Sequence, residues 1–324
     1  MIEAKIKNNE VTVFKYEEYI LIIPNEYGNV SVKNSLSIPL FESELSHWKE
    51  QKLANYPMSL DETIVELNNP FSLSDSEKQK INESLEKTNF IIYQVKAHDD
   101  VTENKEIVRS IGKQFGLSRL DHNECADDDA ITSLQVNHEG LHNYYIPYSN
   151  KAINWHTDGY YNKLDEQIHA IILHCVHPAE EGGENQLLDP EMVYLQLHDQ
   201  NPEFIQALQE DDAMMIPKNI IDGELIRPDR PGPVFMFDEN RQLHMRYTAR
   251  KRNVVWKDTA IVTEVEQALR DTMSVEKNPY IFTGTLAAGQ GLLCRNILHT
   301  RSQFDNPEKS SRLLLRARYF DKIN

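Results

Sequence analysis

Apolar and polar residues alternate along several stretches of the chain, and this pattern of period two is typical of half-buried β-strands. The clearest stretch is 311–320, which predicts a strand with Arg312 and Arg316 on one face and Leu313 and Leu315 on the other. Similar patterns predict further strands over 11–14, 19–23, 89–95, 167–176 and 185–189, and two strands within 278–293.

Apolar residues spaced three and four apart predict helices between these strands. The segment 103–115 is a clear example, because Ile107, Val108 and Ile111 lie near one helical face and Gly116 follows. Further helices are expected over about 41–53, 72–87, 190–209, with an interruption near Asn201-Pro202, and 262–273.

These elements predict a mainly β fold with flanking helices, in the α+β class. A chain of 324 residues with 40% hydrophobic side chains can bury the core of one large domain or of two small ones. Prolines and glycines make the segment 211–253 rich in loops. We therefore expect 211–253 to be a long irregular segment within a lid-like insertion over about 190–255, because loops often carry specificity while the scaffold holds the site.

Charge and cysteine content narrow the function classes. A net charge of −17 argues against a nucleic-acid partner, because binding to phosphates needs a basic surface. No stretch approaches the roughly 20 apolar residues of a membrane-spanning helix, and the start lacks the apolar middle of a signal peptide, so a cytoplasmic protein without a membrane partner is expected. Cys125, Cys175 and Cys294 are widely spaced without a CxxC, which indicates neither a disulfide framework nor a zinc ribbon.

The candidate chemistry centres on the stretch 154–159, NWHTDG in one-letter code. In an extended segment, the triplet His156-x-Asp158 places both side chains on the same face. His299 lies far downstream and can complete a set of two imidazoles and one carboxylate. Such a set occupies one face of an octahedron and leaves the other open, as expected for non-haem Fe(II) that binds oxygen and a cosubstrate together.

Two arginines follow the second histidine at short range. Arg312 lies 13 residues after His299, and Arg316 follows four residues further. A guanidinium that points inward needs an anion, and its planar fork matches a carboxylate through two hydrogen bonds. By contrast, the histidines at positions 169, 174 and 177 lack companion ligands at metal-binding spacing, so structural roles are expected for them.

Several motifs together resemble those of the taurine dioxygenase superfamily of Fe(II)- and 2-oxoglutarate-dependent oxygenases. They are, in chain order, His156-x-Asp158, Gly182-Gly183-Glu184, His299 and Arg312-x-x-x-Arg316. The resemblance covers roughly 89–320 and implies a double-stranded β-helix core, that is, a cupin-like jelly roll. We therefore expect residues 89–324 to form the oxygenase domain and residues 1–88 to form an N-terminal α/β lead-in.

By this resemblance, His156, Asp158 and His299 bind Fe(II), and Arg312 holds the distal carboxylate of 2-oxoglutarate. Asn185 stands where the family often has a threonine whose hydroxyl assists the cosubstrate, and its amide can donate the same kind of hydrogen bond. With O2, such an enzyme hydroxylates or desaturates an unactivated C–H bond and releases succinate and CO2. A carboxylate at position 158 disfavours halogenation, which in this superfamily is associated with a small residue there.

Four residues are candidates for substrate binding. Arg316 matches the residue that grips the substrate's sulfonate in taurine dioxygenase, and the alternative for it is a structural ion pair. Arg246 and Tyr247 also occur in relatives resembling glutarate hydroxylase and clavaminate synthase, and Tyr160 belongs to a tyrosine cluster around the ligands. They imply a small polar substrate, such as an amino acid or another small acid, while the tyrosines keep a betaine-like cation open.

Two other function classes stay open. A non-catalytic small-acid-binding protein on the same fold would not need all three ligands and Arg312. A zinc-dependent hydrolase using His156 and Asp158 would need a general base beside the metal-bound water and would leave Arg312 without a purpose. The first 88 residues are a candidate dimerisation element, which keeps a homo-oligomer open.

Overall fold

The computed structural model describes residues 3–7, 10–14, 42–122, 127, 129–137, 145–305 and 312–324. The chain divides into two compact units, Met1–Pro39 and Leu40–Asn324. In the first unit, β1 (Glu3–Lys7) and β2 (Glu10–Phe14) pair antiparallel, as expected for 11–14, while the expected strand 19–23 lies outside the described residues. The division falls at residue 39 rather than near 88, so the elements between residues 42 and 88 belong to the second unit.

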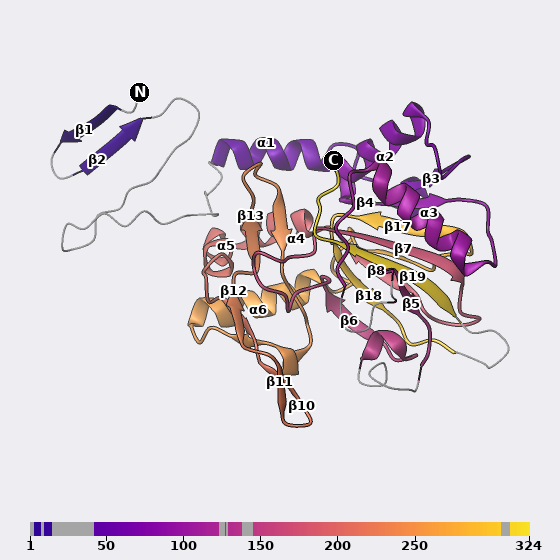
Figure 1. Ribbon diagram of the computed structural model, residues 1–324. Coiled ribbons are helices and arrows are strands. Elements are labelled where there is room, and N and C mark those ends of the chain that lie inside the picture. Colours follow the sequence, from indigo (N-terminus) through magenta and orange to yellow (C-terminus); the bar gives the residue numbers. More distant parts are fainter. Residues whose placement is uncertain are drawn as a thin grey trace. The chain divides into compact units, whose positions relative to one another are not determined.

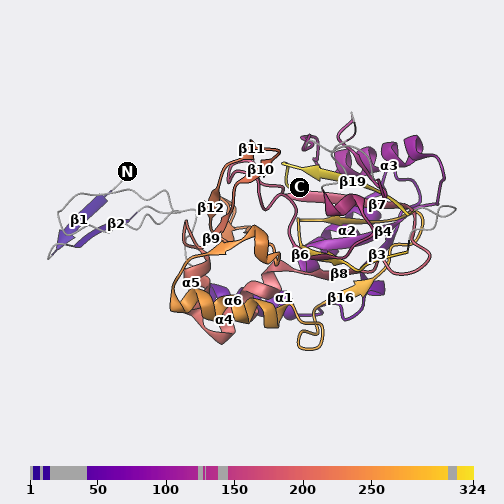
Figure 2. The same ribbon diagram turned by 90° about the horizontal axis from the view of Figure 1, so that it is seen from below.

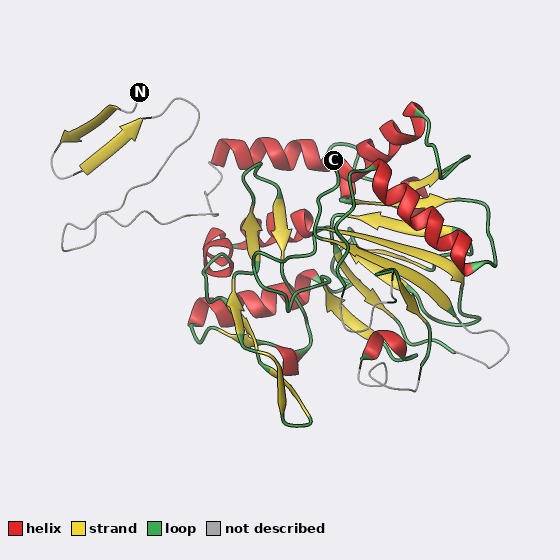
Figure 3. Cartoon of the chain, viewed as in Figure 1, coloured by secondary structure: helices red, strands yellow, loops and turns green. Residues whose placement is uncertain are grey.

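Two β-sheets form the centre of the second unit (Figures 1 and 3). The larger sheet has the order β3 (Ile64–Glu66), β4 (Phe90–Gln94), β17 (Gln290–Cys294), β7 (Ala170–His177), β19 (Leu313–Tyr319), β5 (Thr132–Leu134). The smaller sheet has the order β16 (Phe282–Gly284), β8 (Asn185–Leu188), β18 (Leu298–Arg301), β6 (Ile153–His156). Within the described ranges, neighbouring strands of both sheets are antiparallel except for the pair β3 and β4.

Helices α2 (Asp75–Thr88) and α3 (Val101–Gln114) cover one face of the larger sheet (Figure 1). One apolar cluster lies between these helices and the sheet, and it includes Leu313, Leu315 and Ala317 of β19. The opposite face contributes Leu314 to a second cluster that also contains residues of the smaller sheet. The arginines of β19 therefore lie on the side of the smaller sheet, which confirms the predicted division of faces.

Local sequence signals explain where the helices begin and end. The side chain of Ser74 accepts a hydrogen bond from the Glu77 amide at 3.3 Å, and Glu77 accepts one from the Ser74 amide at 2.7 Å, which starts α2. The side chain of Asp100 caps α3 by accepting hydrogen bonds from the amides of Thr102 and Glu103. Asn201 separates α4 (Pro190–Gln200) from α5 (Pro202–Leu208), as the interruption near Asn201-Pro202 predicted.

The segment from α4 to α6 (Ala260–Thr272) forms a helical layer with small sheets (Figure 2). One sheet has the order β12 (Arg230–Gly232), β9 (Met214–Ile216), β15 (Val255–Trp256). Two further sheets have two strands each: β10 (Asn219–Ile221) with β11 (Glu224–Arg227), and β13 (Phe235–Phe237) with β14 (Leu243–Met245). The expectation of a long irregular insertion over 211–253 was therefore wrong. Its prolines do not prevent strands, because Pro231 lies on the edge strand β12, where a missing N–H costs no ladder bond.

The remaining elements are short connections and one helix: α1 (Glu42–Leu53), η1 (Leu60–Thr63), η3 (Ile146–Tyr148) and η4 (Lys251–Asn253). Helices α1 to α6 confirm, to within a few residues, the predicted helices over 41–53, 72–87, 103–115, 190–209 and 262–273. In the part of the chain that the structure describes, none of the helices has the length and apolar character needed to cross a membrane.

Candidate metal centre and its pocket

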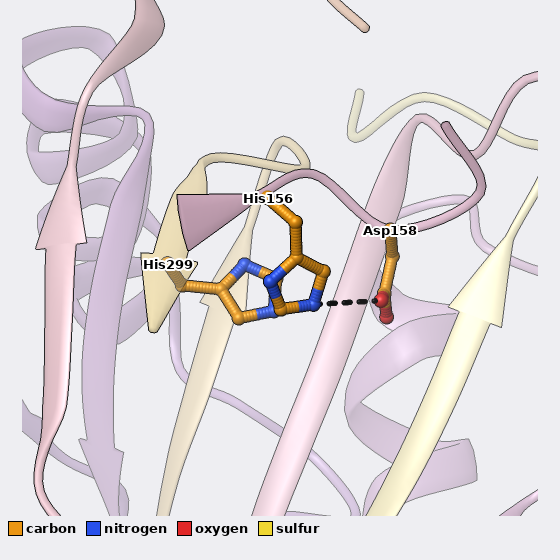
Figure 4. A group of neighbouring side chains, drawn as sticks. All are labelled: His156, Asp158 and His299. Atoms are coloured by element: carbon orange, nitrogen blue, oxygen red, sulfur yellow. Dashed lines mark ion pairs between the residues drawn. The ribbon is translucent and has the colours of Figure 1, made fainter. Parts of the chain in front are cut away.

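The three candidate ligands come together at the edge of the smaller sheet (Figure 4). His156 is the last residue of β6, and its Cα pairs across the strands with His299 of β18. Asp158 follows two residues after β6, and one ligand atom from each of the three residues lies within 4.8 Å of the others. Within the described ranges, no other group of three His, Cys, Asp or Glu side chains has this geometry.

Both imidazoles present the same nitrogen to the centre. Nδ1 of His156 donates to the carbonyl of Asn154 at 2.9 Å, and Nδ1 of His299 donates to the carbonyl of Ile297 at 3.0 Å. A carbonyl only accepts, so the proton sits on Nδ1 and the Nε2 lone pair is free for a metal. Burial, reinforced by His156, lowers the pKa of His299 to about 4, which keeps this ring neutral near pH 7.

Asp158 supplies an ionised oxygen. Its side chain is buried, and Oδ1 lies 3.6 Å from Nε2 of His156. Burial opposes ionisation, but the nearby guanidinium groups of Arg316 and Arg318 outweigh it and hold the pKa of Asp158 well below its usual range. Oδ2 accepts no hydrogen bond from a described residue, although Nη1 of Arg316 lies 3.3 Å away. Two neutral imidazole nitrogens and one carboxylate with an open oxygen fit the donor set of non-haem Fe(II).

Asn296 fixes the backbone of the carboxylate ligand, and the sequence analysis did not identify it. Its side chain accepts a hydrogen bond from the Asp158 amide at 2.8 Å and donates to the Asp158 and Ile168 carbonyls at 2.9 and 2.6 Å. Asn296 is buried and has a positive φ of 48°, a conformation that asparagine tolerates better than most residues. An asparagine three residues before a candidate histidine ligand was the available signal.

The cavity beside the centre is rich in positive charge. Its lining includes the three candidate ligands and the guanidinium groups of Arg301, Arg312 and Arg316, with apolar side chains around them. Three guanidinium groups face the single carboxylate of Asp158, a surplus of two positive charges among these four groups. A buried surplus of this size calls for an anionic ligand.

Arg301 is the second residue that the sequence analysis missed. It donates to the carbonyls of Ser149 and Lys151 at 2.6 Å each and of Pro147 at 3.2 Å, and thereby ties the segment before β6 to β18. Its guanidinium lies 5.0 Å from the ring centre of Phe304. Burial and the neighbouring guanidinium groups lower the pKa of Arg301 to about 9.

Arg312 lies near the same Phe304 ring. It is buried, and its guanidinium carbon is 4.9 Å from the ring centre of Phe304. Burial lowers the pKa of Arg312 to about 10, so it remains a cation near pH 7. The structure thus brings Arg312 into the cavity of the metal centre, as expected.

The Gly182-Gly183 turn is shaped by close backbone approach. Both residues have positive φ, 76° and 73°. A Cβ on Gly182 would lie 2.2 Å from the carbonyl oxygen of Gln303, and a Cβ on Gly183 would lie 3.3 Å from Nε of Arg312. Only glycine meets both requirements, so the motif brings the turn against the segment that carries Phe304.

The residues predicted for cosubstrate and substrate differ in position. Asn185 lines the cavity, and its Nδ2 donates to the Thr300 carbonyl at 2.7 Å. Tyr160 is outside the lining, and its hydroxyl accepts a hydrogen bond from Asn253 at 2.9 Å.

Arg246 and Tyr247, which were expected to bind substrate, lie outside the lining of the cavity. Arg246 is fully buried and donates to the carbonyls of Tyr160, Met214 and Arg230 at 2.8, 3.1 and 2.6 Å. Tyr247 is buried in the apolar core. Neither lines the cavity: Arg246 joins the insertion to the Tyr160 carbonyl, and the centre of the Tyr247 ring lies 6.3 Å from that of the Trp256 ring in the insertion.

The other chemistry-bearing residues agree with structural roles. His174 is buried between the Tyr93 hydroxyl, 3.0 Å from Nδ1, and the Asn104 side-chain oxygen, 2.7 Å from Nε2. Cys175 and Cys294 are buried free thiols, and Cys125 lies outside the described residues.

Comparison with known proteins agrees with this site. The model of the taurine catabolism dioxygenase TauD, TfdA family matches residues 52–318, so the chain belongs to this family. The match begins before residue 89, where the sequence analysis placed the start of the resemblance. The protein is accordingly an Fe(II)- and 2-oxoglutarate-dependent dioxygenase.

Two curated relatives share sequence with about half of the chain. A uridine-5'-phosphate dioxygenase from a Streptomyces species is 29% identical over 195 residues, which are 59% of this chain and 70% of the relative. A uridine-5'-phosphate dioxygenase from an Amycolatopsis species is 30% identical over 169 residues, which are 51% of this chain and 60% of the relative.

Solved structures share the fold at lower identity. An asparagine oxygenase in complex with Fe(II), 2S,3S-3-hydroxyasparagine and succinate has a TM-score of 0.52 at 10% identity, with 86% of this chain and 92% of that chain covered. The non-heme iron oxygenase OrfP in complex with Fe and alpha-ketoglutaric acid has a TM-score of 0.54 at 16% identity, with 87% and 94% covered. These likenesses establish a mixed α+β fold shared with such oxygenases.

Proposed function

We propose that His156, Asp158 and His299 hold the Fe(II) of this dioxygenase, between two sheets that are the halves of a double-stranded β-helix. The observation that carries the proposal is the cross-strand histidine pair, in which both Nδ1 atoms are engaged by carbonyls. Both Nε2 atoms and the open oxygen of Asp158 are therefore available to one ion.

Arg312 is the proposed partner of the distal carboxylate of 2-oxoglutarate, with Asn185 as a second contact. Both line the cavity of the metal centre, and the surplus of buried positive charge suits a dianionic cosubstrate. Bound Fe(II), with 2-oxoglutarate and O2, supplies the oxidation of a C–H bond, while 2-oxoglutarate is converted into succinate and CO2. The protein contributes the position of these groups and a cavity that limits access of water.

Arg316 has two proposed tasks. Its Nη1 lies 3.3 Å from Oδ2 of Asp158, which orients the carboxylate and keeps it ionised. Its Nε is buried without a hydrogen-bond partner among the described residues, so a donor remains for an acidic group of the substrate. This combines both alternatives drawn from the sequence, the ion pair and the contact with substrate.

The proposed substrate is a small anionic molecule that is hydroxylated or desaturated at a C–H bond. Uridine 5'-phosphate is the first compound to test, because both curated relatives are named for it. Amino acids and other small acids form the comparison set. Succinate release that rises with uridine 5'-phosphate, and not with its nucleoside or with amino acids, would support this choice, whereas the reverse pattern would replace it.

An anaerobic titration tests the metal chemistry directly. Metal-free protein receives Fe(II) and then 2-oxoglutarate, and the visible charge-transfer band of a keto acid chelated to ferrous iron is recorded. The band should need both components and should be lost in His156→Ala. It should persist in His47→Ala, which removes an exposed histidine of α1. Bound iron without a band in the parent protein would contradict the proposal.

A further inference from the structure

Two arginines of the insertion have positive charges that no described residue neutralises. Arg227 ends β11, and Arg230 begins β12. Both are half-buried, and neither forms an ion pair with any residue in the described ranges. The chain carries 51 acidic against 34 basic residues, so acidic partners are abundant elsewhere. A pair of half-buried cations in such a protein indicates a place for an external anion.

The donors of the two arginines are only partly used. Nη2 of Arg227 donates to the Pro217 carbonyl at 2.8 Å, which orients the guanidinium. The Nε atoms of Arg227 and Arg230 are both buried without a hydrogen-bond partner among the described residues. Burial, with Arg230 nearby, lowers the pKa of Arg227, which shows that its charge is held at a cost in the absence of an anion.

The pair borders the segment that carries the metal ligand Asp158. The guanidinium carbon of Arg227 lies 5.4 Å from the ring centre of Tyr161, three residues after Asp158. The hydroxyl of Tyr161 accepts a hydrogen bond from Arg318 at 3.0 Å, and Arg318 follows Arg316 on the same face of β19. Tyr161 therefore links Arg227 of the insertion to Arg318, which neighbours Arg316 along β19.

Aromatic rings accompany this positive charge. Tyr160 and Tyr161 meet edge to face, with ring centres 5.2 Å apart. An aromatic wall beside two guanidinium groups suits a ligand that has a planar ring and a multiply charged oxyanion. A single carboxylate needs only one guanidinium fork, whereas a phosphate dianion can use two.

We propose that Arg227 and Arg230 form a binding site for a phosphate monoester group of the substrate, with Tyr161 as the adjoining wall. This inference rests on the proposed function, since it assigns a phosphate group of the substrate to residues outside the metal cavity and leaves Nε of Arg316 for a second acidic or polar group of the same substrate. It separates two tasks: Arg312 and Arg316 act inside the cavity, and the two arginines of the insertion hold the charged end of the substrate.

The test replaces each arginine with glutamine. Arg227→Gln removes the charge and keeps a polar side chain with an amide donor in place of the group that contacts the Pro217 carbonyl. Arg241→Gln is the matched control, because it removes an exposed arginine of the same insertion that pairs with Glu44. Thermal unfolding of each variant checks that the fold is retained.

Isothermal calorimetry then compares the nucleotide proposed above with its nucleoside, on protein loaded anaerobically with Fe(II) and 2-oxoglutarate. We expect nucleotide affinity to fall at least about tenfold in Arg227→Gln and in Arg230→Gln, with nucleoside affinity unchanged. Arg241→Gln should match the parent. Equal nucleotide affinity in all four proteins would overturn the phosphate site.

A second titration separates this inference from the proposed function. Inorganic phosphate is titrated into metal-free protein, where neither iron nor cosubstrate is needed. Binding by the parent that is weakened in Arg227→Gln supports the site even if the charge-transfer band never forms or the nucleotide is not the substrate. Absence of phosphate binding by the parent, or equal phosphate binding by parent and variants, refutes the phosphate site. If the charge-transfer band of the Fe(II) and 2-oxoglutarate complex still forms, the proposed function remains intact.

Discussion

Replacement of Asn296 by alanine should weaken both the fold and the metal centre. The change removes three hydrogen bonds to the backbone at Asp158 and Ile168. At about 1 kcal/mol for each bond, their loss costs about 3 kcal/mol. Alanine at the positive φ of 48° adds about 1 kcal/mol, so the free energy of unfolding should fall by about 4 kcal/mol. Asn296→Gly should cost about 1 kcal/mol less, because glycine accepts this conformation.

The metal should respond to the same change. The side chain of Asn296 holds the backbone of Asp158 rather than the iron itself, and loss of such a support typically lowers metal affinity about tenfold to a hundredfold. Urea unfolding gives the stability of each variant, and anaerobic competition with a chromogenic ferrous chelator gives the affinity for Fe(II). Asn82→Ala, at an exposed position of α2, serves as the control and should change neither quantity appreciably.

Two results would refute this reasoning. Unchanged stability in Asn296→Ala would mean that the three hydrogen bonds contribute nothing net. A fall in stability with parent-like affinity for Fe(II) would mean that Asn296 supports the fold without positioning Asp158.

Three further predictions concern other parts of the molecule. Arg312→Ala should weaken 2-oxoglutarate binding about a hundredfold and leave Fe(II) affinity nearly unchanged, because a buried charge left without its partner costs about 2–5 kcal/mol. Equal cosubstrate affinity of variant and parent by calorimetry would make Arg312 structural. Burial lowers the pKa of His174 to about 4, so between about pH 6.5 and 4 the unfolded chain binds a proton that the folded chain does not, and stability should fall by about 3 kcal/mol as the pH falls through this range. Urea unfolding of His174→Gln should show a smaller loss of stability with pH, and the same loss as in the parent would contradict this. Gly182→Ala should lower the melting temperature more than Gly223→Ala. Both glycines have positive φ, but a Cβ at 182 would lie 2.2 Å from the Gln303 carbonyl oxygen, whereas nothing lies within 4 Å of a Cβ at 223. Equal falls in melting temperature would exclude the steric cause.

Part of the candidate site could be predicted from the sequence because its signals are local. The spacing of His156 and Asp158 places both side chains together through strand geometry alone. The glycine pair at 182 and 183 was recognised as part of a motif, and both glycines have positive φ. The alternation in β19 predicted which face carries its arginines, and the apolar clusters on its two sides confirm that division.

The errors arose where a residue's partners lie far away in the sequence. Arg246 was assigned to substrate, but its guanidinium is used by three backbone carbonyls of separate segments. Asn296 and Arg301 were missed for the same reason, since only the folded backbone brings their acceptors into reach. Prolines in the insertion suggested irregular structure, whereas an edge strand accommodates Pro231.

By itself, the sequence determined the identity of most helices and strands, the candidate ligand triplet and the family of the chain, because periodicity, capping and short motifs act between neighbouring residues. The tertiary structure decided what those residues face. Pairing of β6 with β18 places His299 opposite His156, and packing of the sheets encloses three arginines with one carboxylate. Register and burial are properties of the whole chain, so the charge surplus of the cavity emerges only after folding.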